Sequence, residues 1–262
     1  MSGFKPALTT ELLKARRSKV LWLTTLGFIF IPFINGLFMV ILKNPELARN
    51  MGLISIKAQI VTGVADWPTF LDVFSQGIAV GGILGFGLAI SWIFGREYSD
   101  HTVKDLLALP TSRSKIVLAK FVIITIWIFI VSVLILFIGV AIGWIIVMPG
   151  WSQEVLINGI VRLFITTCLT LSITYPVAFI ASAGRGYLLP LGFAILMLIL
   201  AQILGATGWG RFFPWAVPSL YSKIAGPQSG QLVIISFLIV ALTGLAGLFL
   251  TFYYWKYSDQ TR

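Results

Sequence analysis

Six long apolar stretches constrain the fold of this chain more than any other feature. A helix needs about 20 apolar residues to cross the roughly 30 Å hydrocarbon layer of a membrane, and each stretch has about that length and no charge. The stretches are residues 20–42, 73–94, 121–147, 163–183, 187–206 and 232–255. A strand of a membrane barrel would be about 10 residues long with alternating polarity. The sequence therefore predicts an all-α, polytopic membrane protein with a single transmembrane domain over residues 1–262.

The composition excludes several classes of protein. Hydrophobic residues make up 58% of the chain and charged residues 11%, whereas soluble domains carry about 25% charged residues, so a soluble enzyme and a disordered chain are excluded. The net charge is +10, but most cations flank the apolar stretches instead of lining a solvated face, so we expect no nucleic-acid partner. One cysteine, Cys168, and one histidine, His101, exclude a disulfide framework and make a metal site unexpected.

Lysine and arginine residues are distributed unevenly between the two sides of the predicted bundle. With six spans both termini lie on one side, whose segments carry 13 Lys and Arg residues against 6 on the other. Because cytoplasmic segments carry this excess, we expect both termini in the cytoplasm. Residues 8–19 separate leucines from cations and predict a short amphipathic helix in the headgroup layer. A basic flank without further function is the alternative.

The predicted spans contain no ionisable side chain, which disfavours a secondary transporter, a channel and a membrane-embedded enzyme. Arg162 adjoins the fourth span, and we expect it to extend to the outer headgroups. A pore-facing cation is the alternative. Glu97, Asp100, His101 and Asp105 lie within one charged loop, and we interpret them as solvated.

Small and polar residues within the spans suggest helix contacts. Glycines at close spacing in the second span permit close approach of another helix, and a face that slides during transport is the alternative. These glycines are Gly77, Gly81, Gly82 and Gly85. We expect interhelical hydrogen bonds from most polar side chains and a substrate contact from one or two. Candidates for the substrate path or gate include Asn35, Gln76 and Gln202.

The cytoplasmic loop of residues 95–120 has the pattern of a short helix. Thr102 and Asp105 have the spacing of a capping box, and Pro110 ends the helix after about two turns. The residues that share its apolar face are Val103, Leu106 and Leu107. Such a helix suits a groove on a partner protein. Packing on the chain's own bundle or on the lipid surface is the alternative.

The outer segment of residues 205–230 is aromatic and nearly uncharged. Structureless loops of this length are uncommon, so we expect short helical pieces that re-enter the outer interface. A lid resting on the headgroups is the alternative. The aromatic residues that we add to the candidate path or gate are Phe212, Phe213, Trp215 and Tyr221.

The loop sequence REYSDHTVKDLLALPTSR, residues 96–113, followed by Lys120, resembles the cytoplasmic loop of ABC-2-type export permeases with the type V exporter fold. It is most similar to permeases of bacitracin and lantibiotic resistance, and the segment FPWAVPSLY at residues 213–221 fits the same family. The resemblance implies an N-terminal elbow helix, a coupling helix between spans 2 and 3, and a re-entrant segment before span 6. It implies contact with an ABC ATPase for Glu97, Thr102, Val103, Lys104, Asp105, Leu106, Leu107 and Leu109.

The chain lacks the sequence G-x-x-x-x-G-K-[ST] that cradles ATP phosphates. We therefore expect a non-enzymatic permease that binds no cofactor, with ATP and Mg²⁺ held by two copies of a partner ATPase. The resemblance also implies a second permease copy or a homologous permease, within membrane lipid of a bacterial or archaeal cytoplasmic membrane. The expected substrate is amphipathic or hydrophobic: an antimicrobial peptide, a drug or a lipid-like molecule. The alternatives are a membrane anchor or sensor for an ATPase, and a channel or secondary carrier.

Overall fold

The computed structural model describes residues 3–44, 64–100, 112–224 and 232–258. The described helices are α1 (Phe4–Arg16), α2 (Lys19–Lys43), α5 (Trp67–Ser99), α7 (Arg113–Ile145), α8 (Gln153–Ala183), α9 (Leu188–Gly205), α10 (Val217–Tyr221) and α11 (Ile234–Tyr257), with two short 3-10 helices, Gly210–Phe212 and Pro214–Ala216. Six of them are long and apolar enough to cross a membrane. These six coincide with the six apolar stretches, so the all-α, six-span prediction is confirmed.

Several spans begin at a side chain that caps the helix. Asp66 accepts a hydrogen bond from the Thr69 amide at 2.9 Å, and Ser152 accepts one from the Val155 amide at 3.1 Å. Each cap satisfies one of the backbone amides that a helix start leaves unpaired. Ser18 caps α2 in the same way and so separates α2 from α1.

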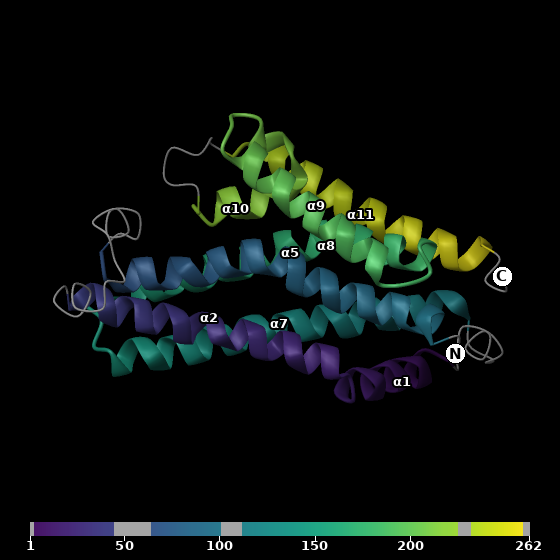
Figure 1. The fold of residues 1–262 in the computed structure, drawn as a ribbon, viewed down its shortest axis with the longest axis horizontal. Coiled ribbons are helices and arrows are strands. Elements are labelled where there is room, and N and C mark those ends of the chain that lie inside the picture. The colour runs from purple at the N-terminus through teal and green to yellow at the C-terminus, as the bar shows by residue number, and fades with distance from the viewer. Residues whose placement is uncertain (1–2, 45–63, 101–111, 225–231, 259–262) are drawn as a thin grey trace.

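The bundle is built around α5 and α8 (Figure 1). These two helices pack along each other, α2 pairs with α7, and α11 packs against α8. Figure 1 shows α5 and α8 between α2 and α7 on one side and α9 and α11 on the other. The core is largely aromatic where α5 faces its neighbours, and includes Phe70, Phe74, Phe86 and Phe94.

Both chain ends lie at the same end of the bundle, on the right in Figure 1. We call this the terminal end, and it also holds the last turn of α5 and the first turn of α7. The opposite end, with α10, is the distal end. In Figure 1, α1 extends largely along the bundle instead of across it, so its expected placement flat in the headgroup layer is not confirmed.

The segment before α11 consists of short helical pieces at the distal end. The two 3-10 helices and α10 pack against α8, α9 and α11, and α10 also contacts α5. Val217 is fully buried in a small core with Ile83, Ile173 and Val240. The expected short helical pieces are therefore present. Ala216, Val217 and Leu220 are buried, whereas Phe212 of the first 3-10 helix is exposed.

Several helices extend beyond their charge-free stretches, and in α5 and α8 the extension includes a charged residue. α5 has 33 residues and α8 has 31. Asp72 lies within α5 and Arg162 within α8, and the two form an ion pair. The predicted stretches 73–94 and 163–183 contain no charge, but Asp72 and Arg162 each lie one residue before their stretch, within the helix that continues into it. Arg162 does not stand alone at the headgroups, because Asp72 neutralises it.

Candidate functional site

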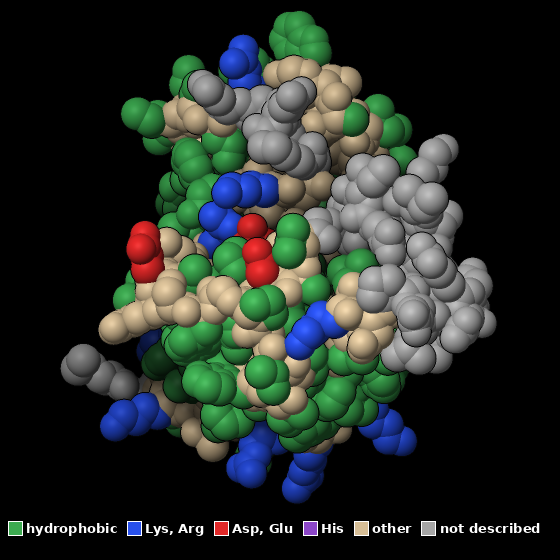
Figure 2. All heavy atoms as spheres, turned by 90° about the vertical axis from the view of Figure 1, so that its left-hand side faces the viewer, with side chains coloured by type: hydrophobic (Ala, Val, Ile, Leu, Met, Phe, Trp, Pro, Cys, Tyr) green, Lys and Arg blue, Asp and Glu red, His purple; other side chains and the backbone are tan. Residues whose placement is uncertain are grey.

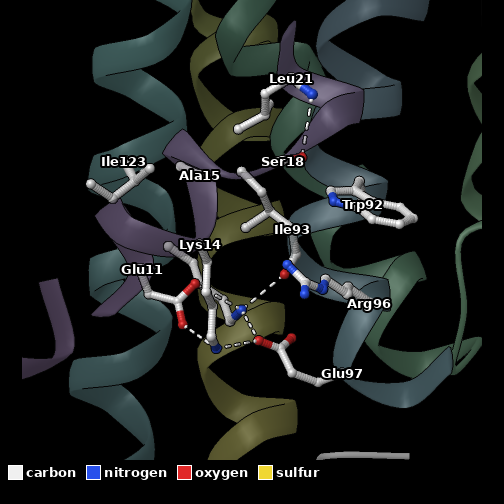
Figure 3. Close-up of a pocket in the computed structure, with 11 residues that line it drawn as sticks. Glu11, Lys14, Ala15, Ser18, Leu21, Trp92, Ile93, Arg96, Glu97 and Ile123 are labelled. Carbon is white, nitrogen blue, oxygen red and sulfur yellow. Dashed lines mark hydrogen bonds and ion pairs between the residues drawn. The ribbon is translucent and has the colours of Figure 1, made fainter. Parts of the chain in front are cut away.

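Four charged side chains meet inside the terminal end and form what we call the ionic cluster: Glu11, Lys14, Glu97 and Lys120. Lys120 Nζ donates to Glu97 Oε1 at 2.6 Å and to Glu11 Oε2 at 3.2 Å. Lys14 Nζ donates to Glu11 Oε1 at 2.9 Å and to Glu97 Oε1 at 3.1 Å. Figure 3 shows Glu11 and Lys14 of α1 converging on Glu97 of α5. The ionic cluster therefore joins α1, α5 and α7.

The sequence of α1 delivers two of these residues to the bundle. Ala7 and Glu11 are the buried residues of α1 and lie four positions apart, on one helical face. Lys14 follows Glu11 by three positions and therefore also lies on that side. Ser18 then ends this stretch by capping α2. The helix break allows α1 to pack against α7 while α2 continues into the bundle.

The ionic cluster is buried and its charges balance. The Lys120 side chain is 1% exposed, that of Glu11 6% and that of Glu97 5%, whereas Lys14 is 32% exposed. An ammonium group has three protons to donate, and Lys120 donates to the two carboxylates and to the Ile93 carbonyl oxygen at 2.8 Å. Lys120 is therefore fully paired, as a charge in a dry interior must be, whereas the second oxygen of Glu97, Oε2, is buried without a hydrogen-bond partner.

The ionic cluster flanks residues 101–111 on both sides. Glu97 precedes this segment near the end of α5, and Lys120 follows it in the second turn of α7. A small cavity beside the ionic cluster is also lined by Trp92 and Arg96, and Arg96 pairs with Asp100 at 3.1 Å. The two helices that enter and leave residues 101–111 are thus tied together by buried ion pairs.

The sequence-predicted coupling residues divide into two groups. Thr102, Val103, Lys104, Asp105, Leu106, Leu107 and Leu109 lie outside the described residues. The interpretation of Glu97 as solvated is wrong, because its carboxylate binds Lys120 and Lys14 inside the protein. Asp100 is exposed, as expected. A direct contact of Glu97 with an ATPase stays a prediction.

A second polar group lies at the distal end. Arg162 of α8 pairs with Asp72 of α5, and each side chain is about a quarter exposed. Gln76, one turn after Asp72, donates to the Ser222 carbonyl oxygen at 3.5 Å. Arg162 is also close enough to Tyr221 to act on its hydroxyl, whose pKa burial raises and the guanidinium lowers only in part. Figure 2, which views this end, shows acidic and basic side chains adjacent near the middle of a largely hydrophobic face.

The remaining path or gate candidates do not form one cluster. Asn35 donates to the Phe70 carbonyl oxygen at 3.0 Å and so joins α2 to α5. Gln202 is exposed on α9. Phe213 packs on Trp215, which in turn meets Phe193 of α9. Of the candidates, Gln76 and Tyr221 thus lie in or beside the Asp72 and Arg162 group.

The glycines of α5 serve two helix contacts. A Cβ at Gly77 would lie 3.1 Å from Ile31 of α2, and a Cβ at Gly85 would meet Phe28 of the same helix. The nearest neighbour of a Cβ at Gly81 would also be Phe28. Gly82 instead faces Thr170 of α8. The small residues therefore lie where α5 approaches neighbours within this chain.

Sequence reasoning missed Glu11 and Lys14 in the ionic cluster, and Asp72 at the distal end. Glu11 carried a usable signal, because it lies four positions after Ala7 and one before Leu12 in a helix with an apolar face. A carboxylate on such a face would be buried, and a buried charge is stable only beside a counter-ion, so a buried cation is expected there. Lys120 had no local signal for its partners, which are 23 and 109 positions away. Among the described residues, no three His, Cys, Asp or Glu side chains gather to hold a metal ion.

Comparisons with known proteins agree with this architecture. The family model described as ABC-2 family transporter protein matches residues 7–201, which include all four members of the ionic cluster. The chain is 30% identical over 192 residues to the bacitracin transport permease protein BCRB of Bacillus licheniformis. That alignment covers 73% of this chain and 91% of the relative. The chain therefore belongs to the ABC-2 transporter family, as a multi-pass permease subunit of an ATP-binding-cassette exporter in the cell membrane.

Proposed function

We propose that a separate ATPase subunit drives this permease through residues 101–111, and that the ionic cluster passes the movement to the bundle. One observation carries the proposal: buried ion pairs join α1, α5 and α7 on both sides of that segment. A displacement of residues 101–111 would then move α5 and α7 together instead of bending the loop between them.

The physical basis is the stiffness of a paired, water-excluded contact. Charge-assisted hydrogen bonds are about twice as strong as neutral ones, and the pairing of Lys120 with Glu97 spans only 2.6 Å in a buried site. Parting these groups would expose an unpaired charge to the interior, which costs several kcal/mol. Movement of the three helices as a unit avoids that cost.

In this proposal the terminal end lies in the cytoplasm, where ATP is available. The cation excess on that side supports the orientation. Two ATPase copies would bind ATP and Mg²⁺, since the chain has no phosphate-binding loop of its own. A second permease copy or a homologous permease would complete the path, which would alternate between inward-open and outward-open arrangements.

We further propose an amphipathic peptide antibiotic as the substrate. The similarity to a bacitracin transport permease supports this class. The spans are apolar apart from paired charges near their ends, and such surfaces offer a small ion nothing to replace its hydration. The Asp72 and Arg162 pair beside Tyr221 is the polar group closest to the distal mouth of the proposed path.

The test of the coupling role replaces Leu106 and Leu107 by Asp in the complex with the ATPase. We expect loss of ATPase co-purification and of substrate-stimulated ATP hydrolysis, because two carboxylates would oppose an apolar docking face. Leu188→Asp with Leu189→Asp is the matched control: this exposed leucine pair also lies at the terminal end, but on α9. Unchanged co-purification and hydrolysis in the Leu106 and Leu107 variant would refute the docking role.

A membrane anchor or sensor for an ATPase is the rival function. It predicts the same docking, so binding alone does not separate the two. Reconstitution with the ATPase in vesicles does: the exporter accumulates a labelled peptide antibiotic in inside-out vesicles on addition of ATP, and an anchor does not. The variant Lys120→Met should keep ATPase binding and lose accumulation if the ionic cluster transmits the movement.

A further inference from the structure

A groove between α7 and α11 runs along the surface of the bundle at the terminal end. Its lining residues are Ser114, Phe249, Leu250, Phe252, Tyr253 and Lys256. Its volume of about 390 Å³ falls within the range of about 300–1,000 Å³ typical of ligand sites. Most of this wall belongs to α11, which lies beyond the residues that the family model matches.

The groove changes from apolar to basic along its length. Phe249 and Lys256 are seven residues apart on α11, which at 1.5 Å per residue is about 10 Å along the helix axis. Phe249 and Leu250 are exposed and lie on the membrane side, and Lys256 lies in the last turn toward the terminal end. A phospholipid has the same arrangement, with apolar acyl chains at one end and a polar headgroup at the other.

The basic end of the groove has an excess of positive charge. Arg113 of α7 donates to the Trp255 carbonyl oxygen at 3.5 Å, which places a second cation at the backbone position that directly precedes Lys256. No lining residue is acidic. The described carboxylates of this end, those of Glu11, Glu97 and Asp100, bind other cations. An anionic headgroup would therefore find Lys256 and Arg113 without a competing carboxylate among these residues.

We propose that this groove binds an anionic phospholipid from the leaflet around the terminal end, with its phosphate at Lys256 and Arg113 and its acyl chains along Phe249 and Leu250. Tyr253 and Ser114 supply hydroxyl groups near the headgroup. The lipid would bridge α7 and α11 next to the start of α7. The proposal does not depend on the ATPase or on the transported substrate.

The test measures lipid binding to the full chain in mild detergent by native mass spectrometry. The chain is titrated with phosphatidylglycerol and, separately, with phosphatidylcholine of the same acyl chains. Lys256→Gln with Arg113→Gln should weaken phosphatidylglycerol binding about thirtyfold, which at 1.4 kcal/mol per tenfold is about 2 kcal/mol for two cations near the membrane surface. Phosphatidylcholine binding should be unchanged.

The control variant removes two exposed cations of the terminal end outside the groove, Arg16→Gln with Lys19→Gln. An equal loss in this control would mean diffuse attraction of lipid to a basic surface and would overturn the proposal. Full binding in the Lys256 and Arg113 variant would overturn it as well. Ser114→Trp fills the groove without changing the charge and should reduce binding of both lipids, so unchanged binding there would place the lipid elsewhere.

Discussion

Lys120 offers the sharpest test of the buried charges, through the replacement Lys120→Met. Methionine keeps much of the side-chain length and removes the ammonium group. Glu11 and Glu97 would then share Lys14 as their remaining cation in the ionic cluster, so that one negative charge loses its partner. Breaking a buried ion pair in this way costs about 3–5 kcal/mol.

From the structure we expect the loss of stability in Lys120→Met to lie near the lower end of that range. Lys14 stays within 2.9 Å of Glu11 and 3.1 Å of Glu97 and compensates part of the lost attraction. We therefore expect the free energy of unfolding to fall by about 3 kcal/mol. The second change Glu97→Gln restores the charge balance, because Lys14 and Glu11 then form one pair. The double variant should lie within about 1 kcal/mol of the parent, which corresponds to one lost hydrogen bond.

The assay is unfolding in mixed detergent micelles, followed by the fluorescence of the nine tryptophans. Lys115→Met is the matched control, since Lys115 lies on the same helix, is partly exposed and has no ion pair within the described part of the chain. The reasoning is refuted if Lys120→Met is as stable as the parent. It is also refuted if Glu97→Gln lowers the stability of Lys120→Met further.

Two further predictions concern contacts between the spans. Arg162→Gln should lower the free energy of unfolding by about 1–2 kcal/mol, a value between those of exposed and buried ion pairs, because both partners are about a quarter exposed. Adding Asp72→Asn should recover at least half of this loss in the same assay. No recovery would contradict the ion pair. Gly139→Ala should cost about 1–2 kcal/mol through overpacking, because the new methyl group would overlap the buried ring of Phe74. A Cβ at Gly192 would meet no neighbour within 4 Å, so Gly192→Ala should leave the stability unchanged or raise it, because Ala is the better helix former. Equal losses of stability in both variants would show that overlap with the Phe74 ring is not the cause.

The spans were predictable because run length is a local property. About 20 apolar residues have one stable arrangement in lipid, a helix whose backbone groups pair within the segment. The same reasoning could not find where the helices end. α5 continues beyond its apolar run at both ends, to Trp67 and to Ser99, because a helix persists wherever neighbouring helices supply partners for its polar side chains.

The candidate site was predictable only in its position along the chain. The pattern of residues 95–120 drew attention to Glu97 and Lys120, but it suggested a solvated loop at Glu97. The structure shows a buried carboxylate. Burial of this charge requires Lys14 and Lys120, one from α1 and one from α7, and no spacing within the loop encodes that meeting.

The amino-acid sequence alone determined the helical class, the six spans and the side of the membrane expected to hold the basic segments, since each follows from the solvation of a short stretch of chain. Tertiary structure alone decided which charges are paired. The partners of Lys120 and of Arg162 lie up to 109 positions away, and an ion in a dry interior is stable only when packing brings its counter-ion into contact.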